Sequence, residues 1–325
     1  MSDNKPTVLI TGCSDGGLGA ALALAFHAAG FHVYATARDV AKMAQLCATA
    51  NAATTVEQSQ TTGMIETLSL DVQSAASIAD CVARVKRLDI LVNNAGALLT
   101  MPVADVSIAQ AKDIFDINVW GVLAVTQAFL PLLLESARRR STGGGSGGGI
   151  VAVNTSVAST VPVPFYGVYS ASKAAMAMFC DTMRLELDAF GVHVVELKTG
   201  AVGPTRLVAN NTSLASTVGG HGSTGPILPE KSIYAPARGG GRGHHAPRVR
   251  RRLDASCEVG ATGRAGPAEE VGAAGPDVAR AERPFGVAGA VRAIILGPGL
   301  GEEDDQVHAS RGGAEAGSHL PGQRC

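Results

Sequence analysis

The architecture expected for this chain rests on residues 7–19, Thr-Val-Leu-Ile-Thr-Gly-Cys-Ser-Asp-Gly-Gly-Leu-Gly. A short apolar, strand-like run leads directly into a glycine-rich turn, which opens an Ala/Leu-rich helical segment. Glycine suits such a turn because the backbone bends sharply and can approach a pyrophosphate, which then meets the N-terminus of the following helix. Because the turn lies between a strand and a helix, it favours dinucleotide binding over an ordinary strand-to-helix connection.

Outward from this turn, residues 6–200 alternate short β-branched runs with amphipathic runs, as in repeated strand–helix–strand units. The expected strands are residues 7–11, 31–37, 64–70, 90–93, 150–154 and 192–197, and the expected helices are about 17–29, 40–48, 74–86, 107–136 and 167–189. Gly30 and Gly191 follow the first and last helix, where a left-handed conformation costs glycine nothing. Since parallel strands need cover on both faces, the pattern predicts an α/β fold with a doubly wound, parallel, Rossmann-type sheet.

The composition disfavours several classes of protein. With 27 Lys and Arg against 28 Asp and Glu, the net charge is −1, so no overall field attracts nucleic acid or an anionic membrane. The chain has no uninterrupted run of about 18 apolar residues and no signal-peptide pattern, so we expect a cytoplasmic protein without a membrane span. The six cysteines form no Cys-x-x-Cys pair and no His/Cys metal spacing, which predicts reduced thiols and no metal site.

The 40 glycines are unevenly placed. Residues 141–149, Ser-Thr-Gly-Gly-Gly-Ser-Gly-Gly-Gly, follow a basic run and are typical of a flexible surface linker. Residues 239–325 contain 18 Gly but only 14 Val, Ile, Leu and Phe, fewer than a core usually needs. We therefore expect one Rossmann-type domain over residues 1–236 and a Gly/Ala/Arg/Pro-rich tail over 237–325 that is not a folded domain.

Three interpretations of this tail stay open. It is a disordered appendage, an Arg/Gly-rich segment that binds nucleic acid around residues 238–252, or out-of-frame translation of a GC-rich gene. The second is disfavoured because that segment has no aromatic side chain to stack on bases, so we expect no nucleic-acid partner. The third is our working hypothesis, because Gly, Ala, Arg and Pro have GC-rich codons while the missing Lys, Asn, Tyr and Met have AT-richer ones.

The end of the second expected strand bears on the choice of cofactor. An acidic residue there binds the ribose 2′-hydroxyl of NAD, whereas an arginine pairs with the 2′-phosphate of NADP. Arg38 comes first after the strand, and its planar guanidinium suits a phosphate. Asp39 follows, and it is also a candidate N-cap for the next helix. This order favours NADP(H) over NAD(H).

Candidate catalytic side chains come from separate parts of the chain. Tyr169 and Lys173 stand four residues apart at the start of an expected helix and so share one face. An ammonium beside a phenol is expected to lower the pKa of the phenol and to make it a usable acid or base. Ser156 follows the strand at 150–154, where its hydroxyl can bond the same substrate oxygen. Asn93–Gly96 ends a strand at the same edge of the sheet, and Asn118 begins the apolar run 119–134.

Each of these residues has a plainer interpretation when taken alone. A Tyr-xxx-Lys spacing occurs by chance in helices, Ser156 and Asn118 are possible caps, and Asp71 is a possible turn residue. Together they favour a catalytic site.

In this order and spacing, the Thr-Gly-xxx-Gly-Gly-Leu-Gly, Asn-Asn-Ala-Gly and Tyr-xxx-Lys motifs resemble the short-chain dehydrogenase/reductase family over about residues 6–205. The resemblance implies that Tyr169 donates a proton to a carbonyl, while Lys173 tunes it and holds the nicotinamide ribose. It also implies that Ser156 steadies the carbonyl oxygen and that Asn118 holds a proton-relay water.

The same resemblance implies a cofactor site around the glycine turn. Asp71 and Val72 would border the adenine, and Asn94–Gly96 would wall the cleft. The expected cofactor contacts are Thr11, Gly12, Ser14, Gly16, Gly17, Leu18, Gly19, Arg38, Asp71, Val72, Asn94, Ala95, Gly96, Tyr169, Lys173 and Val202.

The glycine turn and Ala-Thr-Ala-Arg at 35–38 resemble the branch with the fungal acyl-dihydroxyacetone-phosphate reductases and the 17β-hydroxysteroid dehydrogenases. That branch implies NADPH, a lipid-like ketone and lipid metabolism. Three departures stand out. The turn has one extra residue, so Gly16 and Gly17 cannot be told apart as its middle glycine. Thr199-Gly200 replaces the usual Pro-Gly. No convincing lid helix or seventh strand follows, although residues 291–296 can imitate the strand.

The expected function is NADP-dependent reduction of an apolar, lipid-like ketone, or oxidation of the alcohol, with Tyr169 as proton donor. The alternative is a catalytically impaired, cofactor-binding remnant whose C-terminal substrate region is absent or out of frame. The expected partners are a small carbonyl substrate and a second copy of the chain, since helices near 118–136 and 167–189 pair across a dimer in the family. Endoplasmic-reticulum or lipid-droplet association is implied by the resemblance alone. Apolar residues expected to line the substrate loop are Val202, Leu207, Val208, Leu214, Ile227 and Leu228.

Overall fold

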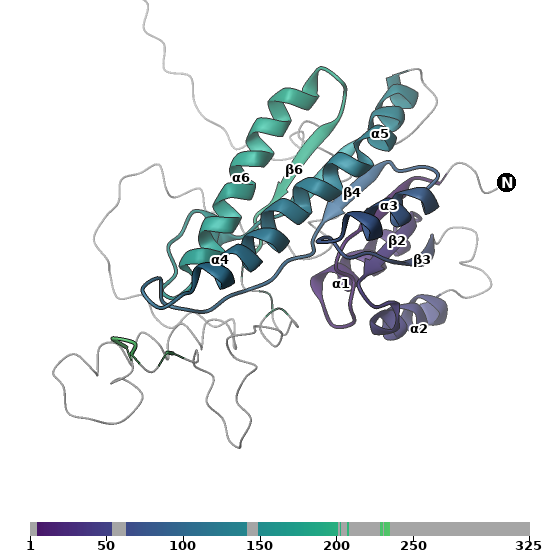
Figure 1. Cartoon of the computed structure of the whole chain (residues 1–325). Coiled ribbons are helices and arrows are strands. Elements are labelled where there is room, and N and C mark those ends of the chain that lie inside the picture. Colours follow the sequence, from purple (N-terminus) through teal and green to yellow (C-terminus); the bar gives the residue numbers. More distant parts are fainter. Residues whose placement is uncertain are drawn as a thin grey trace, which may run out of the picture.

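The computed structural model describes residues 5–53, 63–141, 149–200, 202, 207, 228–229 and 231–234 (Figure 1). Most of the predicted linker, at 142–148, lies outside the described residues. So do the boundary expected at 236/237, the whole tail, and Val208, Leu214 and Ile227 of the expected substrate loop.

The described chain forms one parallel sheet of six strands, in the order β3-β2-β1-β4-β5-β6. The strands are β1 (Thr7–Ile10), β2 (His32–Ala37), β3 (Met64–Ser69), β4 (Ile90–Asn93), β5 (Ile150–Asn154) and β6 (His193–Leu197). The chain moves to one side of β1 for β2 and β3, and then to the other side for β4, β5 and β6. This confirms the predicted doubly wound sheet. It also places a topological switch point, where such sheets bind ligands, between β1 and β4.

Helical segments follow every strand up to β5. They are α1 (Leu18–Ala28), η1 (Val40–Met43), α2 (Ala44–Ala53), α3 (Ala75–Arg84), α4 (Ile108–Phe115), η2 (Asp116–Trp120), α5 (Gly121–Ser141), η3 (Val157–Ser159) and α6 (Gly167–Asp188). Gly30 and Gly191 have φ of 88° and 71°, as expected of glycines that end helices. Two segments differ from prediction. The helix expected at 40–48 opens as a 3₁₀ turn and runs to Ala53, and the helix expected at 107–136 contains the π-helical turn η2 and runs to Ser141.

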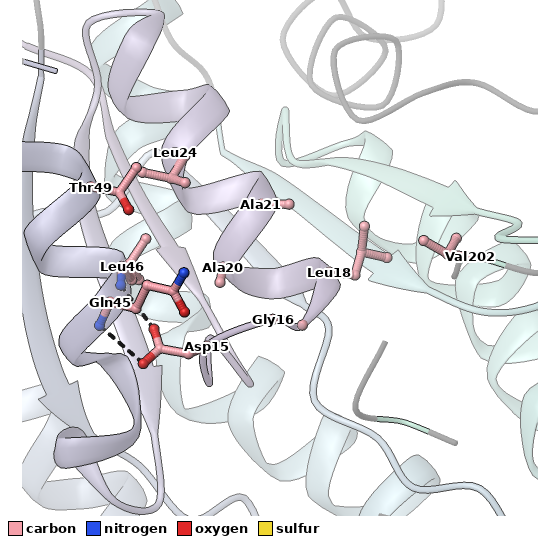
Figure 2. A pocket seen from close by; sticks show the side chains of 11 residues that line it. Asp15, Gly16, Leu18, Ala20, Ala21, Leu24, Gln45, Leu46, Thr49 and Val202 are labelled. Atoms are coloured by element: carbon pink, nitrogen blue, oxygen red, sulfur yellow. Dashed lines mark hydrogen bonds between the residues drawn. The ribbon is translucent and has the colours of Figure 1, made fainter. Parts of the chain in front are cut away.

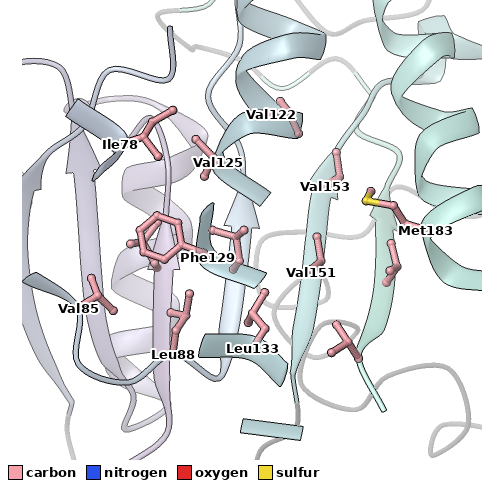
Figure 3. Close-up of a cluster of buried hydrophobic side chains, with 14 of the residues drawn as sticks. Ile78, Val85, Leu88, Val122, Val125, Phe129, Leu133, Val151, Val153 and Met183 are labelled. Atoms are coloured by element: carbon pink, nitrogen blue, oxygen red, sulfur yellow. The ribbon is translucent and has the colours of Figure 1, made fainter. Parts of the chain in front are cut away.

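Alternate strand residues point into two separate cores. Leu9, Leu91 and Val151 lie in one core, where Phe129 and Leu133 of α5 pack beside residues of α3 and α6 (Figure 3). The neighbouring strand residues, such as Val8 and Val92, face α1 and α2 on the other side of the sheet. Both faces are therefore covered, as a parallel sheet requires.

The continuous helical stretch Ile108–Arg139 is long and apolar enough to cross a membrane, and it is the only such helix among the described residues. Its apolar side chains Val122, Val125 and Phe129 are buried against the sheet within the first core. The stretch is therefore accounted for as a core helix of the fold.

A buried carboxylate joins three elements at the edge of the sheet opposite the switch point. Asp89, directly before β4, is fully buried and accepts hydrogen bonds from the backbone and hydroxyl of Thr7, both at 2.8 Å. The Ser136 hydroxyl of α5 also donates to it. The guanidinium groups of Arg87 and Arg139 lie 3.2 and 3.6 Å from its oxygens. Burial alone would raise the pKa of Asp89, but the hydrogen bonds from Ser136 and Thr7, together with the Arg87 charge, hold it below its usual value.

Asp89→Asn is expected to lower the free energy of unfolding at pH 7 by about 3 kcal/mol, because it removes one partner of a buried charged cluster. A carboxyl whose pKa is lower in the folded chain stabilises the fold above its unfolded pKa of about 4, and this stabilisation is lost as pH falls through the folded pKa. The variant should lack this part of the acid sensitivity. Urea unfolding at pH 7 and at pH 3 measures both effects.

Glu135→Gln is the matched control, since Glu135 pairs with Arg138 and Arg139 on the exposed side of α5. Solvent screens these pairs, so the control should stay within about 0.5 kcal/mol of the wild type. Equal stability of Asp89→Asn and wild type at pH 7 would contradict the role of the carboxylate.

Candidate active site

The glycine turn between β1 and α1 is held from the neighbouring strand. Gly12 has a φ of 75°, the left-handed region that favours glycine. The Thr11 hydroxyl accepts hydrogen bonds from the backbone of Asn94 and Ala95, both at 2.9 Å. In return, the Asn94 side-chain amide donates to the carbonyls of Thr11 and Gly12 at 2.9 and 3.2 Å. The Asn-Asn-Ala-Gly motif after β4 therefore supports the turn after β1.

The first turn of α1 approaches the glycine turn too closely for any side chain at Gly19. A Cβ there would lie 2.5 Å from the Gly12 carbonyl oxygen and 2.6 Å from the Asn94 side-chain nitrogen. Gly12 is restricted in the same way, since its Cβ would lie 2.9 Å from the Ala95 Cα. These contacts explain why two of the glycines in the turn are needed.

The structure separates the two glycines that the sequence left ambiguous. Gly17 has an extended backbone, is the N-cap of α1 and lines the large cleft described below. Gly16 has a φ of 72° with no described atom within 4 Å of its Cβ position, and it does not line the cleft. Gly17 is therefore the glycine on the side of the cleft.

Arg38 and Asp39, the two residues after β2, have different roles: one lines the cleft and the other caps a helix. Arg38 is exposed and lines the cleft, and its carbonyl accepts from the Ser69 hydroxyl at 3.3 Å. The Asp39 carboxylate accepts from the backbone of Ala41 at 3.0 Å and so caps η1. The Asp39 carboxylate is thus engaged as a helix cap, while Arg38 lines the cleft.

A cleft of about 400 Å³ runs along the carboxyl ends of the strands. Of the predicted site residues, it is lined by Gly12, Ser14, Gly17, Leu18, Arg38, Asp71, Val72, Asn94, Ala95, Gly96, Ser156, Tyr169, Lys173 and Val202. The predicted residues that do not line it are Thr11, Gly16, Gly19 and Asn118. Thr11 and Gly19 contribute indirectly. The Thr11 hydroxyl holds the turn by hydrogen bonds to the segment after β4, and Gly19, without a side chain, lets α1 pack close to the turn.

Ser156 and Tyr169 meet inside the cleft. The Ser156 hydroxyl lies close enough to the Tyr169 phenol to lower the pKa of that phenol, and it accepts a hydrogen bond from the backbone of Ala158 at 3.1 Å as the N-cap of η3. The catalytic and the capping interpretations of Ser156 are therefore compatible. Both side chains are more than nine-tenths buried, which keeps water away from the phenol.

Lys173 lies one turn further along α6 and is held by the main chain of β5. Its ammonium donates to the Asn154 carbonyl at 2.8 Å and lies 5.9 Å from the centre of the Tyr169 ring. A Cβ at Gly96 would lie 3.2 Å from the Asn118 side-chain oxygen, a tight contact, and 3.6 Å from the ammonium nitrogen, an ordinary one. Burial lowers the pKa of Lys173 to about 8.

The predicted lowering of the pKa of Tyr169 is wrong for this structure. Burial raises the pKa of the phenol, the hydrogen bond with Ser156 opposes the rise, and the neighbouring Tyr166 adds to it. Lys173, whose ammonium donates to the Asn154 carbonyl, is not among the groups that shift the pKa of this phenol. Tyr169 is therefore held protonated at neutral pH, which suits a proton donor.

Asn118 lies in the π-helical turn η2, and its side chain joins two other segments of the chain rather than capping a helix. Its side-chain oxygen accepts from the Ala97 backbone at 2.8 Å, and its amide donates to the Ala97 carbonyl at 2.9 Å and to the Ser172 hydroxyl at 3.0 Å. Both amide hydrogens are therefore engaged, and the side-chain oxygen keeps one lone pair for a further donor. Single π-helical turns of this kind are frequent at functional sites.

Two polar residues of this site have no role in the sequence prediction. Asn154 ends β5, and its amide donates to the Asn94 side-chain oxygen at 3.1 Å, while Thr199 hydrogen-bonds Asn154 from the chain after β6. Their one sequence signal is a polar residue at the carboxyl end of a strand. At the other end of the cleft, the Asp71 carboxylate accepts from the Gln73 backbone at 3.1 Å, as the turn interpretation predicts, and also lines the cleft.

The side of the cleft beside Tyr169 is apolar. Leu98 and Ala158 are buried against the Tyr169 ring, with Val163 and Tyr166 partly buried around them. Of the expected substrate-loop residues that the structure describes, Val202 and Leu207 line the cleft.

Leu228, also expected in the substrate loop, is buried in a nearby cluster with Leu99, Met101 and Ile114. The Ser232 hydroxyl donates to the Asp105 carboxylate at 2.6 Å and ties residues 231–234 to the loop before α4. Among the described residues, no group of three or more His, Cys, Asp or Glu side chains is arranged to hold a metal ion.

The residues present fit a dinucleotide. A backbone cradle that a Cβ would fill at Gly12 and Gly19 stands at the start of a helix, and the cleft extends from Arg38 at one end to the buried Ser156–Tyr169–Lys173 group at the other. The fold and the site together define a Rossmann-type α/β protein whose cleft at the switch point fits a dinucleotide and brings Ser156, Tyr169 and Lys173 together.

Comparison with known proteins defines the family. The model of the short chain dehydrogenase family matches residues 6–214. A short-chain dehydrogenase/reductase of Pestalotiopsis microspora is 47% identical over 239 residues, 73% of this chain and 70% of the relative. The NADPH-dependent 1-acyldihydroxyacetone phosphate reductase of Schizosaccharomyces pombe is 38% identical over 236 residues, 71% of this chain and 68% of the relative.

Among solved structures, a metagenomic short-chain oxidoreductase in complex with NADP is 26% identical with a TM-score of 0.52, over 61% of this chain and 84% of that one. This chain therefore belongs to the short-chain dehydrogenase/reductase family, in the branch that the sequence predicted. Family membership makes it an oxidoreductase acting on CH–OH or C=O groups.

Gly19→Ala is expected to weaken cofactor binding by at least about tenfold and to lower the free energy of unfolding by about 2 kcal/mol, the usual cost of overpacking. The added methyl group would lie 2.5 Å from a backbone oxygen, so α1 has to move away from the turn. Calorimetric titration with NADPH and NADH and a thermal unfolding curve measure the two effects.

Gly191→Ala is the control for lost stability. Among the described residues its Cβ would meet only the Ala137 Cβ, at 3.6 Å, and its φ of 71° costs an alanine about 1–2 kcal/mol far from the cleft. The control should bind cofactor as the wild type does. Unchanged binding by Gly19→Ala would contradict the close approach of α1.

Proposed function

We propose that this protein is an NADP-dependent oxidoreductase that reduces a ketone or aldehyde of an apolar, lipid-like molecule to the alcohol, or catalyses the reverse oxidation. The observation that carries the proposal is that Ser156, Tyr169 and Lys173 line the same cleft as Arg38. One end of this cleft suits a phosphate, and the other suits proton transfer to a carbonyl oxygen.

The chemistry at the reacting oxygen follows from the buried residues. When bound, the nicotinamide supplies the hydride or accepts it. Tyr169, held protonated by burial, donates its proton to the substrate oxygen as the carbonyl becomes an alcohol. Ser156 supplies a second hydrogen bond to the same oxygen and stabilises the charge that develops there.

Two further residues hold this arrangement. Lys173, anchored on the Asn154 carbonyl, has an ammonium that can bond the ribose hydroxyls of a nucleotide in the cleft. Asn118 keeps the Ala97 backbone and the Ser172 side chain of α6 in register, and we assign the relay water to its free acceptor positions. Neither residue transfers the hydride.

Arg38 supports the choice of NADP over NAD. Its guanidinium is the first side chain after β2, it lines the cleft, and the neighbouring Asp39 is engaged as a cap. An arginine there can form a charged, two-pronged contact with a 2′-phosphate. The name of the fission-yeast relative, an NADPH-dependent reductase, supports the same preference.

The apolar substrate is supported by the wall of Leu98, Ala158 and Val163 around Tyr169. The fission-yeast relative is named for reduction of an acylated dihydroxyacetone phosphate, which joins a ketone to an acyl chain. We therefore place the substrate in the lipid-like class.

Homo-oligomer formation is a second element of the proposal. Trp120, the last residue of η2, and Met178 and Leu185 of α6 are more than half exposed. They lie on the helical stretches 118–136 and 167–189, whose pairing the sequence predicted. The cytoplasmic location, and any association with the endoplasmic reticulum or lipid droplets, stay predictions.

Tyr169→Phe is expected to lower turnover of an apolar ketone by about a thousandfold, because general acid catalysis is lost, while NADPH still binds. Turnover is followed by NADPH oxidation over a panel of carbonyl substrates, and binding by calorimetry. Tyr34→Phe, which removes a phenol from β2 outside the cleft, is the control and should keep its activity. Near-normal activity of Tyr169→Phe would overturn the proposal, whereas a wild type that binds NADPH without any turnover would favour the impaired remnant.

Arg38→Asp is expected to shift the ratio of NADPH to NADH affinity toward NADH by at least about tenfold, since it replaces a charge-assisted contact with repulsion. Dissociation constants for both cofactors, measured at one ionic strength, give the ratio. Arg84→Asp makes the same change of charge on the exposed end of α3 and should leave the ratio unchanged. An unchanged ratio in Arg38→Asp would remove the 2′-phosphate role from this residue.

A further inference from the structure

Asp15 is the only charged side chain in the glycine turn, residues 11–19, and it does not line the large cleft. Its carboxylate is turned to the other side, toward the start of α2 (Figure 2). One oxygen accepts from the Gln45 backbone at 3.0 Å and the other from the Leu46 backbone at 2.8 Å. The Asp15 backbone N–H also donates to the Lys42 carbonyl, at 2.7 Å.

These three hydrogen bonds join the turn to residues 42–46, about thirty residues further along the chain. The first N–H groups of a helix have no partner within it, so the carboxylate supplies acceptors to the opening turn of α2. Its negative charge also lies at the positive end of the helix dipole. The contact is therefore favourable in both hydrogen bonding and charge.

The segment that Asp15 holds begins directly after Arg38. The arginine backbone is fixed on the strand side by the Ser69 hydroxyl, and Asp39 then caps η1, which leads into α2. Asp15 ties the far end of this segment to the turn that carries Ser14 at the cleft. The Cys13 N–H also donates to the Thr36 carbonyl at 2.8 Å and ties the turn to the end of β2. Asp15 adds a second connection, on the side of the segment that follows Arg38.

The orientation of the carboxylate matters for charge as well. A carboxylate on the cleft side of the turn would repel the phosphates of a bound nucleotide. Asp15 instead lines a smaller cavity of about 290 Å³ between α1 and α2, among Leu24, Leu46 and Val202. The acidic group is kept close to the turn but directed away from the cleft.

We propose that Asp15 is a positioning residue for the 2′-phosphate of the cofactor, acting through the η1–α2 segment that follows Arg38. The inference rests on the proposed preference for NADP. It assigns to the turn a part in the choice between NADP and NAD in addition to its support of the pyrophosphate.

The test compares the full-length wild type with Asp15→Ala and Asp15→Asn by calorimetric titration with NADPH and NADH. Asp15→Ala is expected to weaken NADPH binding about tenfold and NADH binding less than threefold. Asp15→Asn keeps an acceptor and should lose about threefold for NADPH, a partial rescue. With an apolar ketone, Asp15→Ala should raise KM for NADPH by the same factor while kcat stays within twofold.

Ser107→Ala is the matched control, because Ser107 caps α4 through the Gln110 backbone and does not line the cleft. It should lose thermal stability as a capping variant does and keep the NADPH/NADH ratio. Equal weakening of both cofactors in Asp15→Ala would overturn the proposal and leave Asp15 a support of the turn alone.

Arg38→Ala, measured in parallel, separates the two proposals. A ratio that depends on Arg38 but not on Asp15 would overturn only the role of Asp15. A wild type without NADPH preference would overturn both.

Discussion

The site depends on the close contact between the glycine turn and the helix that follows it. The Gly12 carbonyl lies so near the first turn of α1 that Gly19 has no room for a side chain, and the Asn94 amide donates to that same carbonyl. The Asn154 amide in turn donates to Asn94, and its carbonyl accepts from the Lys173 ammonium. A continuous series of hydrogen bonds therefore joins the dinucleotide turn to the acid–base group across the ends of β1, β4 and β5.

The buried Asp89 cluster and the residues of the cleft lie at opposite edges of one sheet. At the amino ends of the strands, Asp89 is charged, fully paired and held below its usual pKa. At the carboxyl ends, Tyr169 and Lys173 are shifted by burial toward their neutral forms. The difference follows from the partners: Asp89 has two guanidinium groups nearby, whereas Lys173 has a carbonyl oxygen. The first arrangement stabilises a charge, whereas the second favours the neutral forms of the phenol and of the amine.

The parts of the fold and site that could be predicted are those written in short stretches of sequence. The period of apolar residues predicted all six strands, and the Tyr169 to Lys173 spacing predicted a shared helix face. The π-helical turn at Asn118 could not be predicted, because an apolar run carries no sign of one extra residue in a turn. Asp15 and Asn154 were missed for another reason, since their partners lie about thirty and sixty residues away.

The sequence alone determined the order of the strands and helices, the position of the glycine turn and the identities of Ser156, Tyr169, Lys173 and Arg38, because propensity, periodicity and motif spacing are local properties. Only the tertiary structure decided that Gly17 rather than Gly16 is on the side of the cleft. It also decided that the pKa of Tyr169 is raised, against the expectation from Lys173. These outcomes depend on burial and on contacts between distant segments, and both arise only when the sheet and its helices pack together.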